Sequence, residues 1–247
     1  MLAAAFAVTT PVAAQTSTFV AGTTYSSDPL NTYTTFGQYM LGMNMTWTFD
    51  DGSFDSAVFA PFIGPSNDLM AGVKKNGLMF GLEWNDDTFM DSWFADNKTG
   101  KTISSIRLNG QPGKVVFDCG WTSNGCAAVG DPEMLIGSTN SARGRSFQVG
   151  FTIGTSMAIT GEYANLVGLG GAEPVGDIFE QFTMRFTNGF VNNGYVGFLL
   201  DTDNTSGVIT RRVPPPVSTV PEPTSSALML LGFSVLWGAR HRRVRVS

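Results

Sequence analysis

Ser/Lys or carboxylate side chains are those through which this chain could do chemistry, because its only histidine, His241, lies close to the C-terminal end. Sites of the Ser-His-Asp or Cys-His type, and metal sites that need an imidazole, are therefore excluded from the residues before it. Glycoside hydrolysis stays open, since it needs two carboxylates facing each other. Glu180 is the first candidate acid: it shares parity with Phe182 and Met184 on a face predicted to be buried, where its pKa would rise. The alternative is a strand-end glutamate that reaches solvent.

Calcium is the metal that the acidic residues would suit, because hard cations prefer oxygen ligands. Two sets of side chains offer such oxygens: Asp201, Asp203 and Asn204 as the first, and Asp50, Asp51 and Asp55 as the second. The first set has no closing glutamate of the EF-hand kind, and the second coincides with a predicted hairpin turn. We favour structural turns at both positions and expect no other cofactor.

Tryptophan side chains suggest the binding of sugars, whose rings stack on exposed aromatic faces. Trp121 is the first candidate, because it lies between the only two cysteines, Cys119 and Cys126. Trp84 and Trp93 come second, since they flank an acidic segment. The alternative for each tryptophan is packing into or over the core.

Cys119 and Cys126 predict a local disulfide if the chain is exported, because close cysteine pairs in an oxidising compartment most often bond to each other. Closing so small a loop would stabilise the fold by about 2 to 3 kcal/mol. The alternative, a redox or metal site, lacks the histidine or further cysteine that would complete it.

Residues 15–212 predict a single all-β domain, because glycine is abundant and apolar residues alternate with polar ones. Strand-like stretches occupy residues 43–49, 54–59, 78–84, 103–108, 115–117, 147–153, 178–186 and 195–200. Turns at Asp51-Gly52 and Asn76-Gly77 separate some of them, and we expect residues 103–108 and 115–117 to form a hairpin. The expected architecture is an antiparallel β-sandwich with a jelly-roll-like topology.

Residues 1–14 have the features of a partial signal peptide, with an apolar stretch followed by the small residues that a signal peptidase recognises. No positive charge precedes the apolar stretch, so we expect the true start to lie upstream. Before Pro221 the chain has 15 − 4 = 11 basic and 20 − 1 = 19 acidic residues, which gives a formal charge of about −8. That charge argues against nucleic acid and anionic lipid headgroups as partners.

The C-terminal end has three parts in a fixed order. A proline-rich linker, residues 213–223, closes with the motif Val220, Pro221, Glu222 and Pro223. Residues 224–239 are uncharged and apolar, and as a helix they would rise about 24 Å, close to a bilayer core of about 30 Å. The basic tail, residues 240–247, contains Arg240, Arg242, Arg243 and Arg245, which predicts a cytoplasmic end for a transmembrane helix.

This arrangement of motif, apolar stretch and arginine-rich tail resembles the PEP-CTERM sorting signal of Gram-negative bacteria. The resemblance implies recognition and processing by an exosortase, a membrane-embedded enzyme. A single-pass anchor with an accidental Pro-Glu-Pro is the alternative. The resemblance covers about the last thirty residues.

The preceding domain is similar to a group of PEP-CTERM ectodomains, chiefly at residues 43–54, 87–89, 106–117, 138–147 and 201–204. That resemblance implies export and association with the cell surface or extracellular matrix, and it supplies no catalytic residues. Three functions are therefore expected in order: a non-enzymatic surface or matrix component that binds exopolysaccharide, a carboxylate-dependent enzyme acting on glycans, and a purely structural protein.

Overall fold

A computed structural model describes residues 17–20, 23–32, 35–119, 144–154, 158–171 and 177–212. The chain divides into two units, residues 1–212 and 213–247, and all the described residues lie in the first. Apart from two short 3-10 turns, η1 (Gly37–Met40) and η2 (Gln111–Gly113), the regular structure of the described residues consists of β-strands. The predicted all-β class is confirmed.

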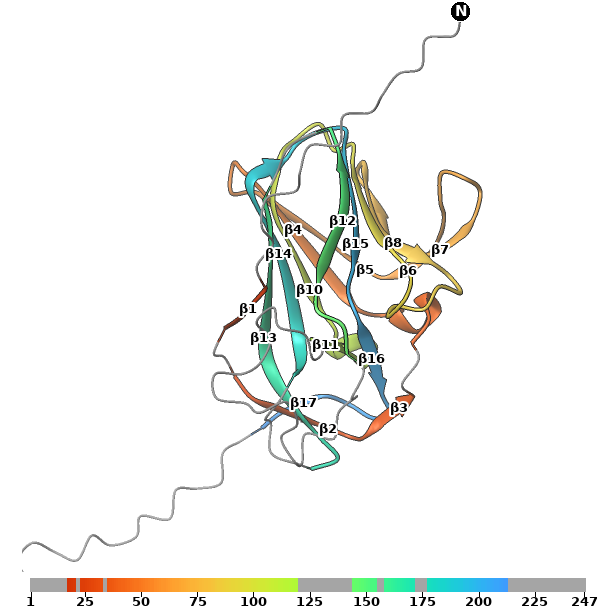
Figure 1. Ribbon diagram of the computed structural model, residues 1–247, viewed down its shortest axis with the longest axis vertical. Coiled ribbons are helices and arrows are strands. Elements are labelled where there is room, and N and C mark those ends of the chain that lie inside the picture. The colour runs from red at the N-terminus through yellow and green to blue at the C-terminus, as the bar shows by residue number, and fades with distance from the viewer. Residues whose placement is uncertain are drawn as a thin grey trace, which may run out of the picture. The chain divides into compact units, whose positions relative to one another are not determined.

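The larger sheet curls into a half-barrel (Figure 1). Its main path runs through β17 (Thr210–Arg211), β2 (Tyr25–Ser27), β13 (Ile159–Leu169), β14 (Ile178–Phe190), β10 (Ile103–Asn109), β4 (Asn44–Phe49) and β5 (Phe54–Val58). Four more strands join this path: β1 (Ser17–Val20) on β13, β11 (Val115–Asp118) on β14, β16 (Thr202–Thr205) on β11, and β3 (Leu30–Thr32) on β16. The β1 and β2 strands run parallel to β13, and the other pairs are antiparallel.

The second sheet is antiparallel throughout. Its order is β12 (Gln148–Ile153), β15 (Gly194–Leu199), β9 (Trp93–Asn97), β8 (Leu78–Glu83), β7 (Leu69–Lys75) and β6 (Ala60–Ile63). The β7 and β8 strands meet at the predicted turn, where Asn76 and Gly77 have φ angles of 48° and 86°. Positive φ at both central residues is required by a type I′ turn, which joins the two strands of a hairpin through two residues.

Both sheets contribute side chains to one core. Phe182 of the larger sheet lies 5.1 Å, between ring centroids, from Phe147, which in turn lies 5.7 Å from Phe198 of the second sheet. Trp47 and Phe80, from opposite sheets, belong to the same fully buried cluster. The two sheets therefore face each other across a shared aromatic interior.

The predicted hairpin between residues 103–108 and 115–117 is wrong. Both stretches are strands, β10 and β11, but they pair one after the other with β14: Asn109 is opposite Gln181, and Phe117 is opposite Phe179. The η2 turn lies between the two strands, so that β11 continues along β14 where β10 ends. The Gly110 N–H donates to the carbonyl of Glu180 on β14 at 2.9 Å. The predicted hairpin of β4 and β5 across Asp51-Gly52 is confirmed.

In the part of the chain that the structure describes, no helix has the length and apolar character needed to cross a membrane. The predicted partial signal peptide, linker, transmembrane helix and basic tail all fall in residues 1–14 and 213–247, outside the described residues.

Candidate functional site

Trp93 does not offer a surface for sugars, and this prediction is wrong. Its side chain is fully buried, with ring centroids 6.0 Å from Phe80 and 6.1 Å from Phe198. Every residue of β9 is buried, so the strand lies inside the sheet with both faces covered. Trp93 points to the core face with Ala95, which leaves its ring out of reach of a polymer.

Trp84 is partly exposed directly after β8, where its backbone N–H donates to the Leu69 carbonyl at 2.9 Å and its carbonyl accepts from Gln38 at 3.0 Å. Trp121 lies outside the described residues, as does Cys126. Cys119 is fully buried just after β11. Sugar binding by Trp121 and the disulfide of Cys119 with Cys126 therefore stay predictions.

Glu180 is buried, as predicted, with 1 % of its surface exposed, but it does not share a face with Phe182. Phe179 and Phe182 both enter the main core, which shows that the alternation is interrupted between them. The Glu180 carboxyl forms side-chain hydrogen bonds with Tyr25, and Tyr25 packs against a smaller apolar cluster. The alternation of residues in the sequence correctly predicted that Glu180 is buried, but it assigned the side chain to the wrong face of β14.

Burial raises the pKa of Glu180, and hydrogen bonds from Gln181, Tyr25 and Asn165 partly offset the shift. The Gln181 Nε2 atom lies 3.5 Å from Glu180 Oε1. None of these three partners is a carboxylate, so the contacts of Glu180 with the described residues do not supply the second acid that glycoside hydrolysis needs.

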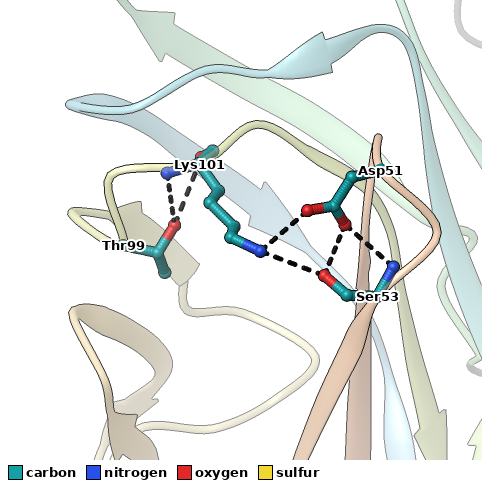
Figure 2. A network of polar contacts seen from close by, with 4 residues as sticks. All are labelled: Asp51, Ser53, Thr99 and Lys101. Carbon is teal, nitrogen blue, oxygen red and sulfur yellow. Dashed lines mark hydrogen bonds and ion pairs between the residues drawn. The ribbon is translucent and has the colours of Figure 1, made fainter.

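Two aspartates of the second candidate calcium set, Asp51 and Asp55, form ion pairs with lysines, and Figure 2 shows the pair of Asp51. Lys101 Nζ lies 2.8 Å from Asp51 Oδ2, and hydrogen bonds from Lys101 and Ser53 hold the pKa of Asp51 well below its usual range. Asp55 likewise accepts hydrogen bonds from Lys75 Nζ at 2.6 Å and Asn76 Nδ2 at 2.7 Å. Lysines thus already neutralise both carboxylates, and the structure favours the turn over the metal here.

The first candidate calcium set does not converge. Asp201 and Asp203 flank Thr202 in an extended chain and share a side, whereas Asn204 points to the opposite face of β16. There its Nδ2 atom donates to the Tyr39 carbonyl at 2.9 Å. The alternation of a β-strand therefore excludes Asn204 from a common site with the two aspartates, and that part of the prediction is wrong.

Asp201 and Asp203 instead belong to a group of aspartates that we call the aspartate cluster: Asp87, Asp118, Asp177, Asp201 and Asp203. The side chain of Asp118, on β11, interacts with that of Asp203, on the neighbouring strand β16, and favours the charged form of Asp203. Asp177 precedes β14. Its backbone carbonyl accepts a hydrogen bond at 2.9 Å from the N–H of Cys119, the residue directly after β11. Asp87 lies in the loop after β8, within electrostatic reach of both Asp201 and Asp203.

Burial is the main influence on the pKa values of Asp201 and Asp203. It raises the pKa of Asp201 to about 8, with the charge of Asp203 as the next cause. Burial likewise raises the pKa of Asp203 to about 7, followed by the charge of Asp177. The neighbouring Thr88 Oγ lies 3.1 Å from the Thr202 carbonyl and 3.4 Å from Asp201 Oδ1, and Asp203 Oδ2 is buried with no hydrogen-bond partner among the described residues.

Asp201 and Asp203 can therefore hold protons at neutral pH, since carboxyl groups in a low-dielectric interior disfavour their charged form. Among the described residues, no group of three or more acidic, cysteine or histidine side chains is arranged to hold a metal ion. The sequence signal for part of the cluster was the Asp-x-Asp spacing of Asp201 and Asp203. Asp87, Asp118 and Asp177 come from separate elements, so no local pattern could have grouped them with that pair.

No family model, curated protein or solved structure matches this chain.

Proposed function

We propose that this protein is an exported, non-enzymatic component of the cell surface or extracellular matrix of a Gram-negative bacterium. The observation that carries the proposal is the C-terminal order of Val220-Pro221-Glu222-Pro223, an uncharged apolar stretch and an arginine-rich tail. Such an ending fits the PEP-CTERM sorting signal, with residues 224–239 as a transmembrane helix and the tail on the cytoplasmic side. Exosortase would act on the C-terminal signal, and signal peptidase on the N-terminal one.

The described domain supports this assignment in two respects. Its last described strand, β17, ends at Arg211, and the Arg212 N–H donates to the Thr24 carbonyl at 3.0 Å, directly before the predicted proline-rich linker. The interior of the domain is a large, mainly aromatic core to which both sheets contribute side chains. An all-β domain followed by a semi-rigid spacer suits a protein held outside the membrane. We place its strands in a jelly-roll-like sandwich.

Binding of exopolysaccharide belongs to the same proposal, because it would retain the domain in the matrix once the C-terminal helix is removed. The surface acidity of the exported part, about −8, disfavours nucleic acid as a partner. The membrane is then a partner only before processing.

Processing tests the proposal directly. The full chain, with a host signal peptide joined before Gln15, would be expressed in a Gram-negative host that has an exosortase and in the same host lacking it. We expect surface protein without residues 224–247 in the first host and retention of the intact C-terminus in membranes of the second. The control variant replaces Pro214 and Pro215 by alanine, which leaves the Pro221-Glu222-Pro223 motif unchanged. Intact residues 224–247 on surface protein from the first host would contradict the proposal.

A further inference from the structure

Three aromatic rings stack across neighbouring strands of the second sheet, which we call the aromatic ladder: Phe94 of β9, Tyr195 of β15 and Phe151 of β12. The ring centroids of Phe94 and Tyr195 are 6.0 Å apart with planes 9° apart, and those of Tyr195 and Phe151 are 5.6 Å and 20° apart. Offset parallel rings at such spacings attract one another. The planes of the three rings are therefore nearly parallel across three neighbouring strands.

The aromatic ladder lies on the outer face of its sheet. Along β9, Trp93 and Ala95 enter the core, and along β15, Val196 and Phe198 do so. Phe94 and Tyr195 alternate with them and thus point away from the core. The exposed surface increases toward β12: Phe94 is buried with 8 % exposed, Tyr195 is half-buried, and Phe151 is 46 % exposed.

A glycine sets the position of the outermost ring. Phe151 is opposite Gly197 in the sheet register, and a Cβ atom at Gly197 would lie only 2.4 Å from Phe151 Cε1. The ring therefore rests on the backbone of β15, as aromatic side chains do when they cover a glycine in a neighbouring strand. One ring face packs on the sheet, and the other side accounts for the exposure of Phe151.

Polar groups adjoin the ladder. Asp96 is opposite Tyr195 in the register and forms an ion pair with Lys98, with 2.7 Å between Nζ and Oδ2. Burial and the charge of Asp96 raise the pKa of Tyr195, so its hydroxyl keeps its proton and can donate as well as accept. On the opposite strand, Ile153 is opposite Tyr195 and 59 % exposed. Apolar ring surface beside hydrogen-bonding groups is the combination that sugar rings require.

We propose that the aromatic ladder is a binding site for a neutral polysaccharide, whose sugar rings pack on Phe151 and Tyr195 while their hydroxyls bond to the Tyr195 hydroxyl and the Asp96–Lys98 pair. This inference rests on the proposed function, in which the domain is retained in an exopolysaccharide matrix. It identifies the residues and the charge class of the ligand.

Two observations favour a neutral polysaccharide over a second copy of the chain. A stable dimer buries about 800 Å² on each partner. Phe151, Tyr195 and Ile153 are each partly covered, and even a whole aromatic side chain offers only about 150 to 250 Å². Like charge also opposes both self-association and anionic polysaccharides, since the exported part carries about −8.

Affinity electrophoresis of the full chain tests this site. The chain would be kept in an amine-oxide detergent, which contains no sugar, and run through native gels containing hydroxyethylcellulose, galactomannan or the anionic alginate. We expect at least one of the neutral polymers to retard the protein and alginate not to. Tyr195→Ala and Phe151→Ala should each raise the dissociation constant obtained from the retardation about tenfold or more. Tyr195→Phe keeps the ring, so its dissociation constant should stay within about threefold of the wild-type value.

Phe54→Ala is the matched control, because Phe54 is an aromatic residue on β5 of the other sheet that is 71 % exposed. It should leave the retardation unchanged. Circular dichroism of each variant would separate lost binding from lost folding. Failure of both neutral polymers to retard the wild type, or unchanged retardation of Tyr195→Ala and Phe151→Ala, would overturn the proposal. So would a loss of dimers in sedimentation of Tyr195→Ala without any change in retardation.

These outcomes are independent of C-terminal processing. Wild-type protein that loses residues 224–247 but is not retarded would remove the ladder site and leave the sorting proposal intact. Protein that is retarded but keeps its C-terminus in an exosortase-containing host would do the reverse.

Discussion

Asp118 and Asp203 bring two side-chain carboxyl groups into interaction across the paired strands β11 and β16. Two carboxylates cannot bond to each other without a proton between them, because each is then only an acceptor. The Asp203 residue is 2 % exposed, and this burial raises its pKa to about 7. The folded protein therefore retains a proton here at a pH where the unfolded chain has lost it.

Stability should fall as the pH rises from about 5 to about 8. The pKa values of Asp201 and Asp203, about 8 and about 7, lie above the ordinary value of about 3.9, so the folded state binds more protons than the unfolded state in this range. For each proton that only the folded state retains, the free energy of unfolding falls by about 1.4 kcal/mol for every unit by which the pH rises. Thermal unfolding followed by circular dichroism at pH 5, 6, 7 and 8 measures the slope.

Asp203→Asn should flatten that slope and raise the melting temperature at pH 8, because the amide cannot ionise. Asp68→Asn, at an exposed position in the turn between β6 and β7, is the matched control and should follow the wild-type slope. Measurements start at pH 5 because Asp55, whose pKa is lowered by Lys75, contributes stability that is lost only at lower pH. An unchanged slope in Asp203→Asn would refute this explanation.

Trp93 and Trp84 should differ sharply in their effect on stability. Trp93→Ala removes a fully buried ring from the core and should lower the free energy of unfolding by about 3 to 5 kcal/mol. Trp84→Ala, at a partly exposed position, should cost less than half as much. Urea unfolding curves monitored by circular dichroism give both values. Similar losses in the two variants would show that Trp93 is not a principal core residue.

Tyr163 contributes a buried hydrogen bond that joins β13 to the start of β12. Its hydroxyl accepts from the Phe147 N–H at 2.9 Å, and Tyr163 and Phe147 are both almost completely buried. Tyr163→Phe preserves the ring but leaves that N–H without its acceptor, so we expect a loss of about 1 to 3 kcal/mol. Tyr39→Phe, at an exposed position, is the control and should be neutral within about 0.5 kcal/mol. Urea titration distinguishes these outcomes.

The sequence predicted those features of the fold that depend on local pattern. Residues 43–49 alternate because one face of β4 is buried, and Asn76-Gly77 predicts a turn because both residues tolerate positive φ. The sequence pattern gave a wrong prediction where the pairing of a strand depends on strands that are distant in the sequence. The β10 and β11 strands look like a hairpin locally, yet both pair with β14.

The candidate sites were harder to predict for the same reason. Trp93 lies in a strand buried on both faces, where alternation carries no information about exposure. Asp118 and Asp203 meet only because β11 and β16 pair, and Phe94, Tyr195 and Phe151 align only through the order of three strands. Contacts between distant segments leave no trace in the spacing of residues.

The predicted disulfide of Cys119 and Cys126 provides a last test, and it bears on the exported location. Cys119 is anchored at the end of β11 by the hydrogen bond of its N–H to Asp177, so closing the loop would restrain the segment that contains Trp121. We expect surface protein, denatured without reductant, to resist alkylation at both cysteines and to gain 2 Da on reduction, one hydrogen for each sulfur. Reduction should lower the free energy of unfolding by about 2 to 3 kcal/mol. Cys126→Ala should show the lower stability with or without reductant. Two alkylated cysteines in unreduced surface protein would contradict both the disulfide and the rigid presentation of Trp121 that depends on it.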